Sequence, residues 1–534
     1  MRKTQEKYYT ELLKENELLL LKSNDSFFDN HYSGSPVNIM TGFEGTAGEA
    51  IIDKTGHIVF FADTRYHKLV DKQLFNDIEI IKMGLTETFF EAFKKRFKPK
   101  TVLYVPNDIK LKDFTQLDEY FDLRSYKLPD KFSKNNDFNK NSPIFLCSKK
   151  VEKNTFLYKV NKLKDIFQDV NHILITNLDE IAYLTNLRSF QNKYSSLFKS
   201  ILLLNLKEKK HILFVDKIPD IKISGLKFKK LSEYKSIIKR YNTPIYVDLS
   251  NITTDIFVGI KNSKMLKNNT ISLISSIKTK SETEYIEACG KRLDRAIFNF
   301  RKKIKEGMSE FELSEIFKEE LLKENAKDLS FKTILAIGEN SASIHYSSPD
   351  KNVFLKKENI ILLDCGGYWK EGFATDITRT FYFGSNPLPI HKKIYTNVLK
   401  AFIACFNSKE TNAKKVDKIA RDMLTPFEKE GFNFNHGLGH GIGTSVHQNP
   451  PRLSITSEDI IKPYQTHSIE PGLYGGCEIK FGVRIENCVW KDLKGKKYSL
   501  THYPFEDILI DYSILNNEEK KFVIKWQKDF KEEK

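Results

Sequence analysis

Cysteine is scarce in this chain: six cysteines are spread over 534 residues, and no two of them form a C-x-x-C pair. So sparse a set excludes a small fold held by disulfide bonds and a cysteine-rich zinc module. It is typical of proteins that fold in a reducing compartment. We therefore expect a cytoplasmic protein with free thiols.

Long apolar runs are absent as well, since no stretch approaches the roughly eighteen residues that a membrane-spanning helix needs. The apolar run Leu18–Leu21 is too short, and too closely flanked by charges, to form the core of a secretory signal. Hydrophobic residues make up 40% of the chain and charged residues 29%, proportions typical of globular proteins. At this length we expect about two to four domains and no membrane segment.

Acidic residues are outnumbered by basic ones, 70 to 86, which gives a net charge of +16. Such a charge suits a nucleic-acid or anionic-surface partner, but it also arises when lysines are spread over solvated faces. The basic clusters Phe93–Lys100 and Gly225–Tyr241 lie far apart in the chain, and no recognised nucleic-acid module accompanies them. We therefore favour the second interpretation and expect no nucleic-acid partner.

Two polar stretches divide the chain: Ser133–Pro143, which is typical of a linker, and Lys267–Tyr285, which leads from a short strand pattern into a helix start. We predict three domains, at 1–142, 143–273 and 274–534. In the first two, short apolar runs alternate with helical patterns, which indicates α/β layers.

The third segment opens with a predicted helix over Ser281–Gly307, where Ser281 and Glu284 have the spacing of a capping box. After a second helix, strand patterns dominate and are interrupted by helices near Ile394–Phe406 and Ala413–Glu430. This order predicts a mixed fold class, α/β and α+β, for the whole chain.

The glycine-rich run HGLGHGIGTSVH (His436–His447) holds three of the twelve histidines. Its alternating glycines argue against a regular helix, because each helical glycine costs about 1 kcal/mol, and they favour a loop or strand with close backbone approach. The run lacks the Glu of an H-E-x-x-H zinc helix and the third Gly of a phosphate-binding G-x-G-x-x-G loop. From this run alone, metal binding, acid–base chemistry and structural packing are all open.

Two aspartates lie where a predicted hairpin would bring them together. Asp364 follows the apolar run Ile360–Leu363, Asp376 opens the return strand, and Gly366–Gly372 supplies the turn. Adjacent buried carboxylates repel each other and are unfavourable without a cation. The hairpin therefore predicts a bound cation.

Two glutamates are placed in a similar way further along the chain. Glu470 ends a short apolar strand that Pro471 and Gly472 stop, and Glu486 lies inside the apolar strand Gly482–Trp490. Four carboxylates and one imidazole form a hard, oxygen-rich ligand set, which suits two divalent ions, Mn²⁺ first and Zn²⁺ or Co²⁺ as alternatives. Two such ions balance four carboxylates in charge, and a bridging hydroxide is their natural further ligand.

These motifs resemble the pita-bread metallopeptidases, and among them the three-domain Xaa-Pro aminopeptidases (aminopeptidase P). The resemblance is carried by DITRT, HGLGHGIG, EPGLY and RIEN around the candidate ligands, and by ILAIGENSASIHY upstream of them. MTGFEGTAGEAIID and ITNLDEIAYLTNLR extend it into the first two segments. It implies two creatinase-like N-terminal domains and a pita-bread catalytic domain, whose C-terminal extension covers residues 500–534.

The resemblance also implies an activity and a set of site residues. The family hydrolyses the first peptide bond of peptides whose second residue is proline, at a dinuclear metal centre, and a homodimer is implied as well. The family's ligands fall on Asp364, Asp376, His440, Glu470 and Glu486. Catalytic roles fall on His345, His447 and Glu470, and substrate contacts on His345, His436, His447, Tyr474 and Arg484.

The sequence departs from the family at one point. Asp364 and Asp376 are twelve positions apart, one more than usual. Because strand side chains alternate faces, an extra residue within a paired strand would turn one aspartate away, so we expect the turn or a bulge to absorb it. Two alternative functions stay open: a prolidase restricted to Xaa-Pro dipeptides, and an inactive pita-bread protein that binds a partner.

Overall fold

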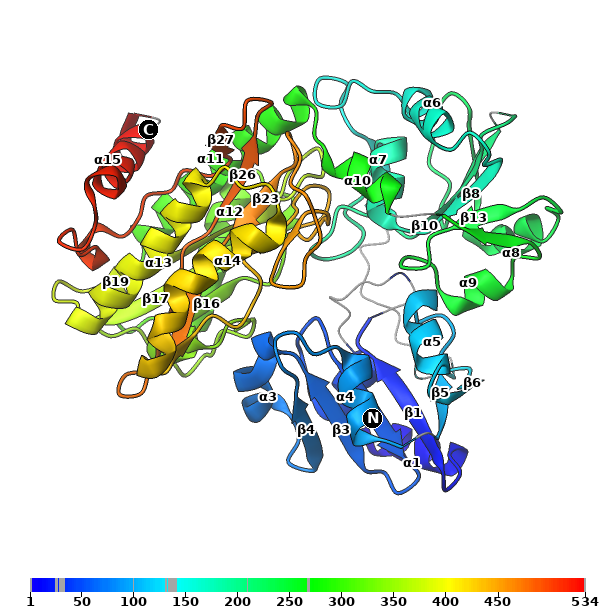
Figure 1. Cartoon of the computed structure of the whole chain (residues 1–534), viewed down its shortest axis with the longest axis horizontal. Coiled ribbons are helices and arrows are strands. Elements are labelled where there is room, and N and C mark those ends of the chain that lie inside the picture. The colour runs from blue at the N-terminus through cyan, green and yellow to red at the C-terminus, as the bar shows by residue number, and fades with distance from the viewer. Residues whose placement is uncertain are drawn as a thin grey trace. The chain divides into compact units, whose positions relative to one another are not determined.

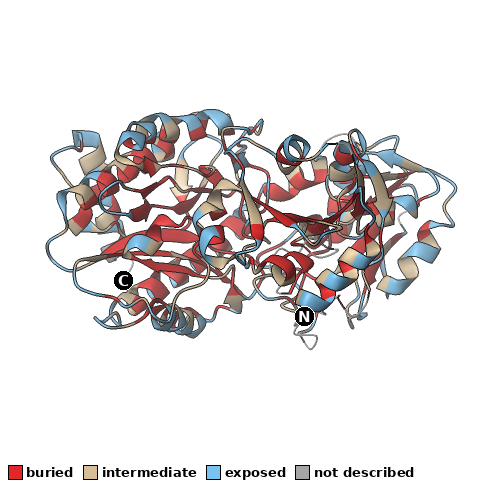
Figure 2. Ribbon diagram, turned by 90° about the horizontal axis from the view of Figure 1, so that it is seen from below, coloured by how far each residue is buried: buried red, intermediate tan, exposed pale blue. Residues whose placement is uncertain are grey.

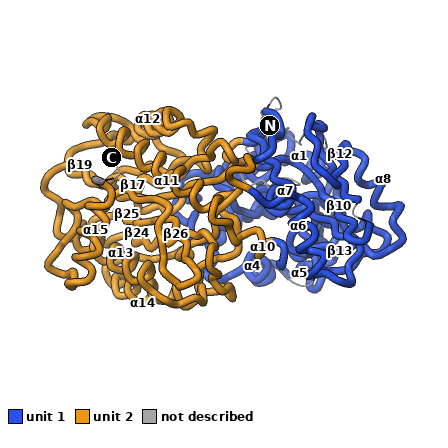
Figure 3. Tube along the Cα trace, turned by 90° about the horizontal axis from the view of Figure 1, so that it is seen from above, with its two compact units in different colours: residues 1–147, 153–192, 197–271 blue, residues 148–152, 193–196, 272–534 orange. Residues whose placement is uncertain are grey.

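The computed structural model describes residues 2–24, 27, 34–98, 100–129, 132, 142–208, 210–266 and 269–532. These residues gather into two compact units (Figure 3). Unit 1 comprises Met1–Cys147, Lys153–Asn192 and Leu197–Ile271, and unit 2 comprises Ser148–Glu152, Lys193–Ser196 and Ser272–Lys534. Most of the predicted linker Ser133–Pro143 lies outside the described residues, and the division into three domains stays a prediction.

Unit 1 contains two six-stranded sheets of the same construction (Figure 1). The first has the order β4 (Ile78–Lys82), β3 (Ile58–Ala62), β2 (Glu49–Asp53), β1 (Glu17–Lys22), β5 (Thr101–Tyr104), β6 (Asp122–Ser125). The second has the order β12 (Leu226–Lys230), β11 (His211–Val215), β10 (Ser200–Asn205), β8 (His172–Ile175), β13 (Ile245–Val247), β14 (Ser263–Met265). In both orders the first pair is parallel, the next two pairs are antiparallel and the last two are parallel. One strand plan therefore occurs twice.

Helices and a short ladder complete unit 1. The helices are α1 (Arg2–Leu12), α2 (Pro36–Thr41), α3 (His67–Gln73), α4 (Phe89–Arg96), α5 (Leu111–Asp118), α6 (Phe156–Ile166), α7 (Leu178–Thr185), α8 (Tyr234–Ile238) and α9 (Thr254–Val258). The ladder pairs β7 (Phe145–Leu146) with β9 (Leu187–Arg188), and α10 (Thr270–Ser276) leads into unit 2. Strands β3 and β10 are buried at every position, as continuous apolar runs predict for strands covered on both faces.

Unit 2 contains two helix pairs, each packed with its own strands into a separate core. Helices α11 (Lys280–Arg301) and α12 (Glu310–Lys323) share one core with β16 (Ile334–Ile337), β17 (Asn359–Cys365) and β19 (Ile377–Phe383). Helices α13 (Pro389–Asn407) and α14 (Ala413–Leu424) share the other with β24 (Gly472–Gly475), β25 (Phe481–Arg484) and β26 (Asn487–Lys491). Figure 2 shows strands coloured as buried and helices with exposed outer faces. The two groups of strands bring the candidate ligands together.

Short strands and a last helix complete unit 2. They are β15 (Asp328–Leu329), β18 (Gly367–Tyr368), β20 (Phe432–Asn433), β21 (Gly439–His440), β22 (Arg452–Leu453), β23 (His467–Ile469), β27 (Lys497–Ser499) and α15 (Asn517–Glu532). Trp526 and Phe530 of α15 reach into the two cores, so the C-terminal residues are part of this unit. None of the described helices is long and apolar enough to cross a membrane.

Helix α11 begins two residues before the predicted capping box. Its N-cap is Thr279, whose hydroxyl accepts a hydrogen bond from Glu282 N at 3.2 Å, while the Glu282 carboxylate accepts one from Thr279 N at 2.7 Å. The predicted Ser281–Glu284 box is therefore wrong. The sequence TKSETE offers this spacing twice, and the N–H of Lys278 is already bonded to a distant carbonyl, which fixes the chain just before Thr279.

A buried carboxylate ties α11 to the segment after β27. Asp294 accepts hydrogen bonds from His502 N at 2.7 Å and from Tyr503 N at 3.0 Å. Burial raises the pKa of this carboxyl from its ordinary value of 3.8 to about 6. The folded protein therefore binds this proton more tightly than the unfolded chain does.

This raised pKa makes stability depend on pH near neutrality. The stabilising contribution is complete below the ordinary pKa and is lost as pH rises through the folded value of about 6. Asp294→Asn cannot titrate, so between about pH 5 and 7.5 the wild type should lose about 1.4 kcal/mol of unfolding free energy relative to the variant. Urea unfolding of both proteins at the two pH values measures this. A difference between them that does not change with pH would contradict it.

Candidate metal centre

The hairpin of β17 and β19 keeps its register despite the extra residue between Asp364 and Asp376. The strands pair without interruption, and the pairing continues in the same register to a bridge between Tyr368 and Ala374. The turn beyond that bridge contains Gly372 at φ +76°. A three-residue hairpin turn with glycine in the left-handed region accommodates one residue more than the common two-residue turn. The expectation that the turn absorbs the extra residue is therefore confirmed.

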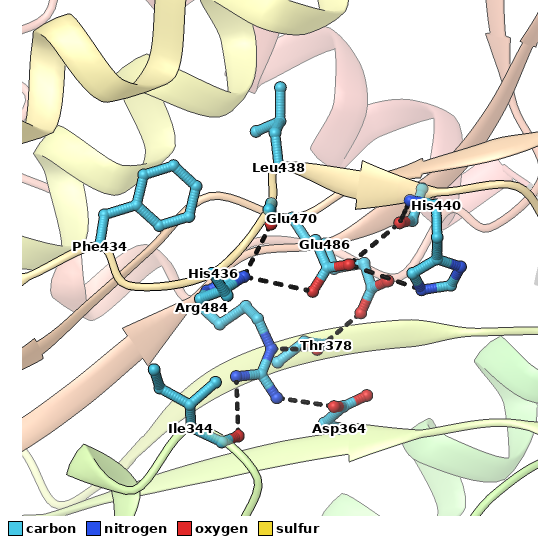
Figure 4. Close-up of polar contacts among 12 residues, drawn as sticks. Ile344, Asp364, Thr378, Phe434, His436, Leu438, His440, Glu470, Arg484 and Glu486 are labelled. Atoms are coloured by element: carbon cyan, nitrogen blue, oxygen red, sulfur yellow. Dashed lines mark hydrogen bonds and ion pairs between the residues drawn. The ribbon is translucent and has the colours of Figure 1, made fainter. Parts of the chain in front are cut away.

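The other candidate ligands lie on or just after three further strands, β21, β23 and β25. They meet the hairpin of β17 and β19 (Figure 4). Asp376, His440 and Glu486 offer ligand atoms that all lie within 4.8 Å of one another. Nε2 of His440 lies 3.6 Å from Oδ2 of Asp376 and 3.5 Å from Oε1 of Glu470. Asp364 lies close enough to raise the pKa of both Asp376 and Glu486. The structure thus brings together all five residues that the sequence predicts as ligands.

Three carboxylate oxygens at this site are buried and have no hydrogen-bond partner. They are Oδ1 of Asp364, Oδ1 of Asp376 and Oε1 of Glu486. Buried polar atoms are rarely left unpaired, because each loses its hydration without compensation. Three such oxygens around one imidazole have the chemistry of a divalent-cation site, and the residues present fit such an ion.

Arg484 is the cation that the protein itself supplies to these carboxylates. Its buried guanidinium donates to Asp364 Oδ2 at 2.6 Å, to the Tyr474 hydroxyl at 2.7 Å and to the Thr378 hydroxyl at 3.0 Å. A fourth hydrogen bond, 3.4 Å long, goes to the carbonyl of Ile344. One guanidinium leaves an excess of negative charge when the four carboxylates are ionised. Divalent cations would balance that excess.

The pKa values of the site reflect the same excess. Burial raises the pKa of Asp376 well above its usual range, and Glu486 is the neighbour that raises it most. Burial likewise raises the pKa of Glu486, followed by the effect of Glu470. The pKa of Asp364 is raised by burial against the opposing effect of Arg484. Carboxyls of this kind bind protons more readily than exposed ones, and a divalent cation competes with those protons.

His440 is oriented toward the carboxylates by its own backbone. Its Nδ1 lies 3.1 Å from the carbonyl of Gly441, which can only accept, so Nδ1 carries the proton. Nε2, which then has a lone pair, faces Asp376 and Glu470. A carbonyl that fixes the tautomer in this way is the usual second partner of a metal-binding histidine.

His436 is held in place by hydrogen bonds at both ring nitrogens. Arg484 donates to the Tyr474 hydroxyl, whose own hydrogen then points to Nε2 of His436 at 3.0 Å. Nδ1 of His436 lies 2.8 Å from the carbonyl of Gly437. The ring packs edge-on against Phe434, with centroids 4.8 Å apart at 90°. The orientation of His436 is therefore fixed, and its Nδ1 also lies 3.9 Å from Oε2 of Glu470.

The last two predicted histidines are not fully buried. The ring of His447, which is exposed, lies 4.3 Å from the ring of His440. His345 is half-buried and directly follows Ile344, whose carbonyl accepts from the site's arginine. Solvent therefore reaches His447, which lies directly beside the candidate ligand His440.

The comparisons with known proteins agree with this geometry. Residues 284–490 match metallopeptidase family M24, and residues 135–287 match the creatinase/prolidase N-terminal domain. The chain carries a family M24 metallopeptidase domain. It is therefore a hydrolase, and the N-terminal domain common to creatinase and prolidase precedes its metallopeptidase domain.

Relatives of similar length extend the likeness beyond this domain. A probable Xaa-Pro aminopeptidase P of Laccaria bicolor is 28% identical over 541 residues, which cover 91% of this chain and 82% of that protein. An X-prolyl aminopeptidase structure from Caenorhabditis elegans has a TM-score of 0.85 at 22% identity, covering 97% of this chain and 91% of that one. A prolidase structure from Pyrococcus furiosus has a TM-score of 0.54 at 24% identity, covering 64% of this chain and 98% of that one. At these identities the two structures show the fold.

Sequence reasoning missed two hydroxyl groups that hold the glutamates of the M24 site. Thr378 donates to Glu486 Oε2 at 2.7 Å. Ser468 donates to Glu470 Oε1 at 3.2 Å and accepts from His440 N at 3.1 Å. A signal was present, because each hydroxyl lies two positions from a candidate acid, on the same side of an extended chain.

Helix α14 holds the strand that leads to the candidate ligand His440. Asp417 and Arg421 form an ion pair one turn apart, with Arg421 Nε 2.9 Å from Asp417 Oδ2. Arg421 donates to the carbonyls of Phe434 and His436, and Asp417 accepts from Leu438 N at 3.1 Å. The ion pair is visible in the sequence, whereas its backbone partners are not.

A second buried carboxylate holds the loop of His345. Glu310 lies in the first turn of α12, where the helix dipole favours an anion. It accepts from Ile337 N at 2.7 Å, from the Tyr346 hydroxyl at 2.7 Å and from Asp350 N at 3.0 Å. These partners lie on both sides of His345, so one side chain fixes both arms of its loop.

Proposed function

We propose that this protein is an Xaa-Pro aminopeptidase that hydrolyses the first peptide bond of peptides with proline in second position. This proposal rests on three buried carboxylate oxygens near His440 that have no hydrogen-bond partner, because such oxygens are suitable ligands for divalent cations. The ligands we propose are Asp364, Asp376, His440, Glu470 and Glu486. The two full-length likenesses, to proteins described as aminopeptidases of this type, support the substrate class.

We propose two metal ions, with Mn²⁺ as the physiological one and Zn²⁺ or Co²⁺ as alternatives. A hard, oxygen-rich ligand set supports this choice, and the Caenorhabditis elegans enzyme is described as having a di-nuclear active site. Two divalent ions held there would supply a water molecule that ionises near neutral pH and a Lewis acid for the scissile carbonyl.

The protein's own residues move the protons. Glu470 accepts the proton of the attacking water and delivers it to the prolyl nitrogen, which has to be protonated before it can leave. Ser468 holds that carboxylate through the 3.2 Å hydrogen bond to Oε1. His345 and His447, at the accessible side of the site, donate hydrogen bonds to the tetrahedral oxyanion.

Proline requires a dedicated pocket. Its nitrogen has no N–H and its ring fixes the backbone, so an enzyme that recognises an extended backbone through that N–H fails on it. The imidazole of His436 forms one wall of the pocket for the proline ring. Phe434 packs against that imidazole, and the Tyr474 hydroxyl holds its Nε2 edge. Tyr474 and Arg484 complete the substrate-binding side in this proposal.

We further propose that the protein is a homodimer of the cytoplasm. The Caenorhabditis elegans relative is described as cytosolic. The free cysteines, five of them buried, are consistent with a reducing compartment.

The decisive experiment compares two peptides. Metal-stripped and Mn²⁺-loaded protein are incubated with Arg-Pro-Pro and with Ala-Pro, and release of the first residue is followed. We expect cleavage of Arg-Pro-Pro that depends on Mn²⁺. Cleavage of Ala-Pro alone would identify a prolidase, and no cleavage together with no bound metal would identify a binding protein.

A further inference from the structure

Two short segments of unit 2 have sequence neighbours that belong to unit 1. Residues 148–152 follow β7, and residues 193–196 lie between β9 and β10, yet both pack with the catalytic part of the chain. The M24 match begins only at residue 284, so both segments lie outside it. Their contacts show what they add to the metallopeptidase domain.

Ser196 connects the hairpin turn and the glycine-rich loop, the two backbone segments next to the candidate ligands. Its side chain is fully buried, and its hydroxyl lies 2.6 Å from the carbonyl oxygen of Gly372 and 3.1 Å from that of Thr444. Gly372 belongs to the turn between Asp364 and Asp376. Thr444 lies in the glycine-rich loop, four residues after His440. A single hydroxyl hydrogen is therefore shared between the two backbone segments that carry candidate ligands.

The segment of Ser196 is held in a fixed conformation. Tyr194 has φ +58°, a left-handed backbone that costs a residue with a side chain about 1 kcal/mol or more. Its N–H donates to Asp328 Oδ2 at 2.8 Å, and Asp328 lies on β15, which pairs with β18 inside the hairpin. The other short segment holds the turn of the β17–β19 hairpin, because Glu371 in that turn accepts a hydrogen bond from Ser148 N at 2.7 Å. Strain of this size persists only where the surroundings determine the conformation.

The glycine-rich loop is equally constrained on its side of Ser196. Gly443 O accepts from Ala374 N at 2.8 Å, a direct bond between loop and hairpin. Oε1 of Gln448 accepts from Thr444 N at 3.2 Å and from the buried Lys278 ammonium at 2.7 Å. A Cβ on Gly443 would lie 1.7 Å from that Oε1, so a larger residue there would push Gln448 out of these two hydrogen bonds. The glycine-rich loop therefore has little freedom to adjust if the hydrogen bonds of the Ser196 hydroxyl are lost.

We propose that Ser196 is a positioning residue of the metal centre, because its hydroxyl holds the hairpin of Asp364 and Asp376 in register with the loop of His440 and His447. This inference rests on the proposed function, and it gives residues 193–196 a part in the catalytic site. The three-residue turn has a role in it, since Gly372 in that turn accepts the hydrogen bond.

The test compares Ser196→Ala with Ser200→Ala in the full-length protein. Ser200 is a matched control: it is buried on β10, and its hydroxyl donates to the carbonyl of Phe198 at 3.1 Å, away from the metal site. Both variants should lose similar stability in urea, about 1 kcal/mol. Co²⁺ affinity and the visible absorption of the bound Co²⁺ report the metal site without any catalysis. We expect Ser196→Ala to bind Co²⁺ about tenfold more weakly, with a changed spectrum, and Ser200→Ala to match the wild type.

Kinetics on Arg-Pro-Pro add a second measurement. Ser196→Ala should lower kcat about tenfold and leave KM unchanged, and Ser196→Cys, which keeps the size but is a weaker donor, should lie between it and the wild type. If Ser196→Ala keeps wild-type Co²⁺ affinity and spectrum, Ser196 only packs and the inference is wrong. If the wild type binds Co²⁺ but cleaves no peptide, and Ser196→Ala still weakens binding, this inference holds while the proposed activity fails. A wild type that binds no metal overturns both.

Discussion

Asp376→Asn is expected to abolish peptide cleavage and at the same time to make the metal-free protein more stable. The carboxylate is buried, one of its oxygens has no partner, and Glu486, Asp364 and Glu470 all raise its pKa. Without a cation this group opposes folding, and asparagine removes the repulsion while keeping the shape. With a cation the same group is a ligand, and its loss should lower kcat/KM by about a thousandfold or more, roughly 4 kcal/mol of barrier.

Two measurements check this expectation together. Urea unfolding in a chelating buffer gives the stability of the metal-free proteins, and Mn²⁺-dependent cleavage of Arg-Pro-Pro gives the activity. Asp294→Asn is the matched control, since it removes a buried carboxylate of the same unit whose hydrogen bonds come from His502 N and Tyr503 N, and it should keep metal and activity. An Asp376→Asn protein that is less stable than wild type in the chelator and still active would show that the carboxylate serves only the fold.

The candidate carboxylates stood out in the sequence because each one opens, interrupts or ends an apolar strand. An acid in that position is expensive to bury unless it binds something, so Asp364, Asp376 and Glu486 stood out. The hairpin register could also be anticipated, since a three-residue turn with Gly372 is a common way to absorb one residue. These features are local, and local chemistry determines them.

The residues that position the ligands could not be predicted. Ser196 lies 176 residues before Gly372 and 248 before Thr444, and no local pattern distinguishes it from any other serine. Arg484 was expected at the site from the resemblance, but sequence spacing does not reveal its acceptors on several separate elements. Such contacts depend on how distant elements pack, and a single sequence does not show which distant segments are in contact.

The strand order of unit 1 was equally hidden. The two sheets have the same order of parallel and antiparallel strand pairs, but the sequence shows no internal repeat that would predict this duplication. The α/β layers expected from alternating apolar runs and helical patterns are present, and two of those apolar runs form β8 (His172–Ile175) and β11 (His211–Val215). Their order in the sheet depends on side-chain packing between strands, which periodicity does not report.

Arg484→Met should cause the largest loss of stability of any single change at the site. The arginine is buried and donates to Asp364, Tyr474, Thr378 and the carbonyl of Ile344. Methionine fills most of the space but leaves four acceptors without their donor and a buried carboxylate without its counter-charge. Removing one partner of a buried ion pair costs about 3–5 kcal/mol, so we expect a loss of that size in the metal-free protein.

Mn²⁺ should recover part of this loss. A divalent cation beside Asp364 replaces some of the missing positive charge, and any ligand that binds only the folded state adds to its stability. Arg484→Lys is the matched variant: it keeps the charge, but its single ammonium cannot reach acceptors on four sides, so its stability should lie between the other two proteins. Urea unfolding of all three, with chelator and with Mn²⁺, measures both effects. If Arg484→Met stays within about 1 kcal/mol of wild type in the chelator, the carboxylates are neutral in the metal-free protein, because a buried charge could not lose its partner at so small a cost.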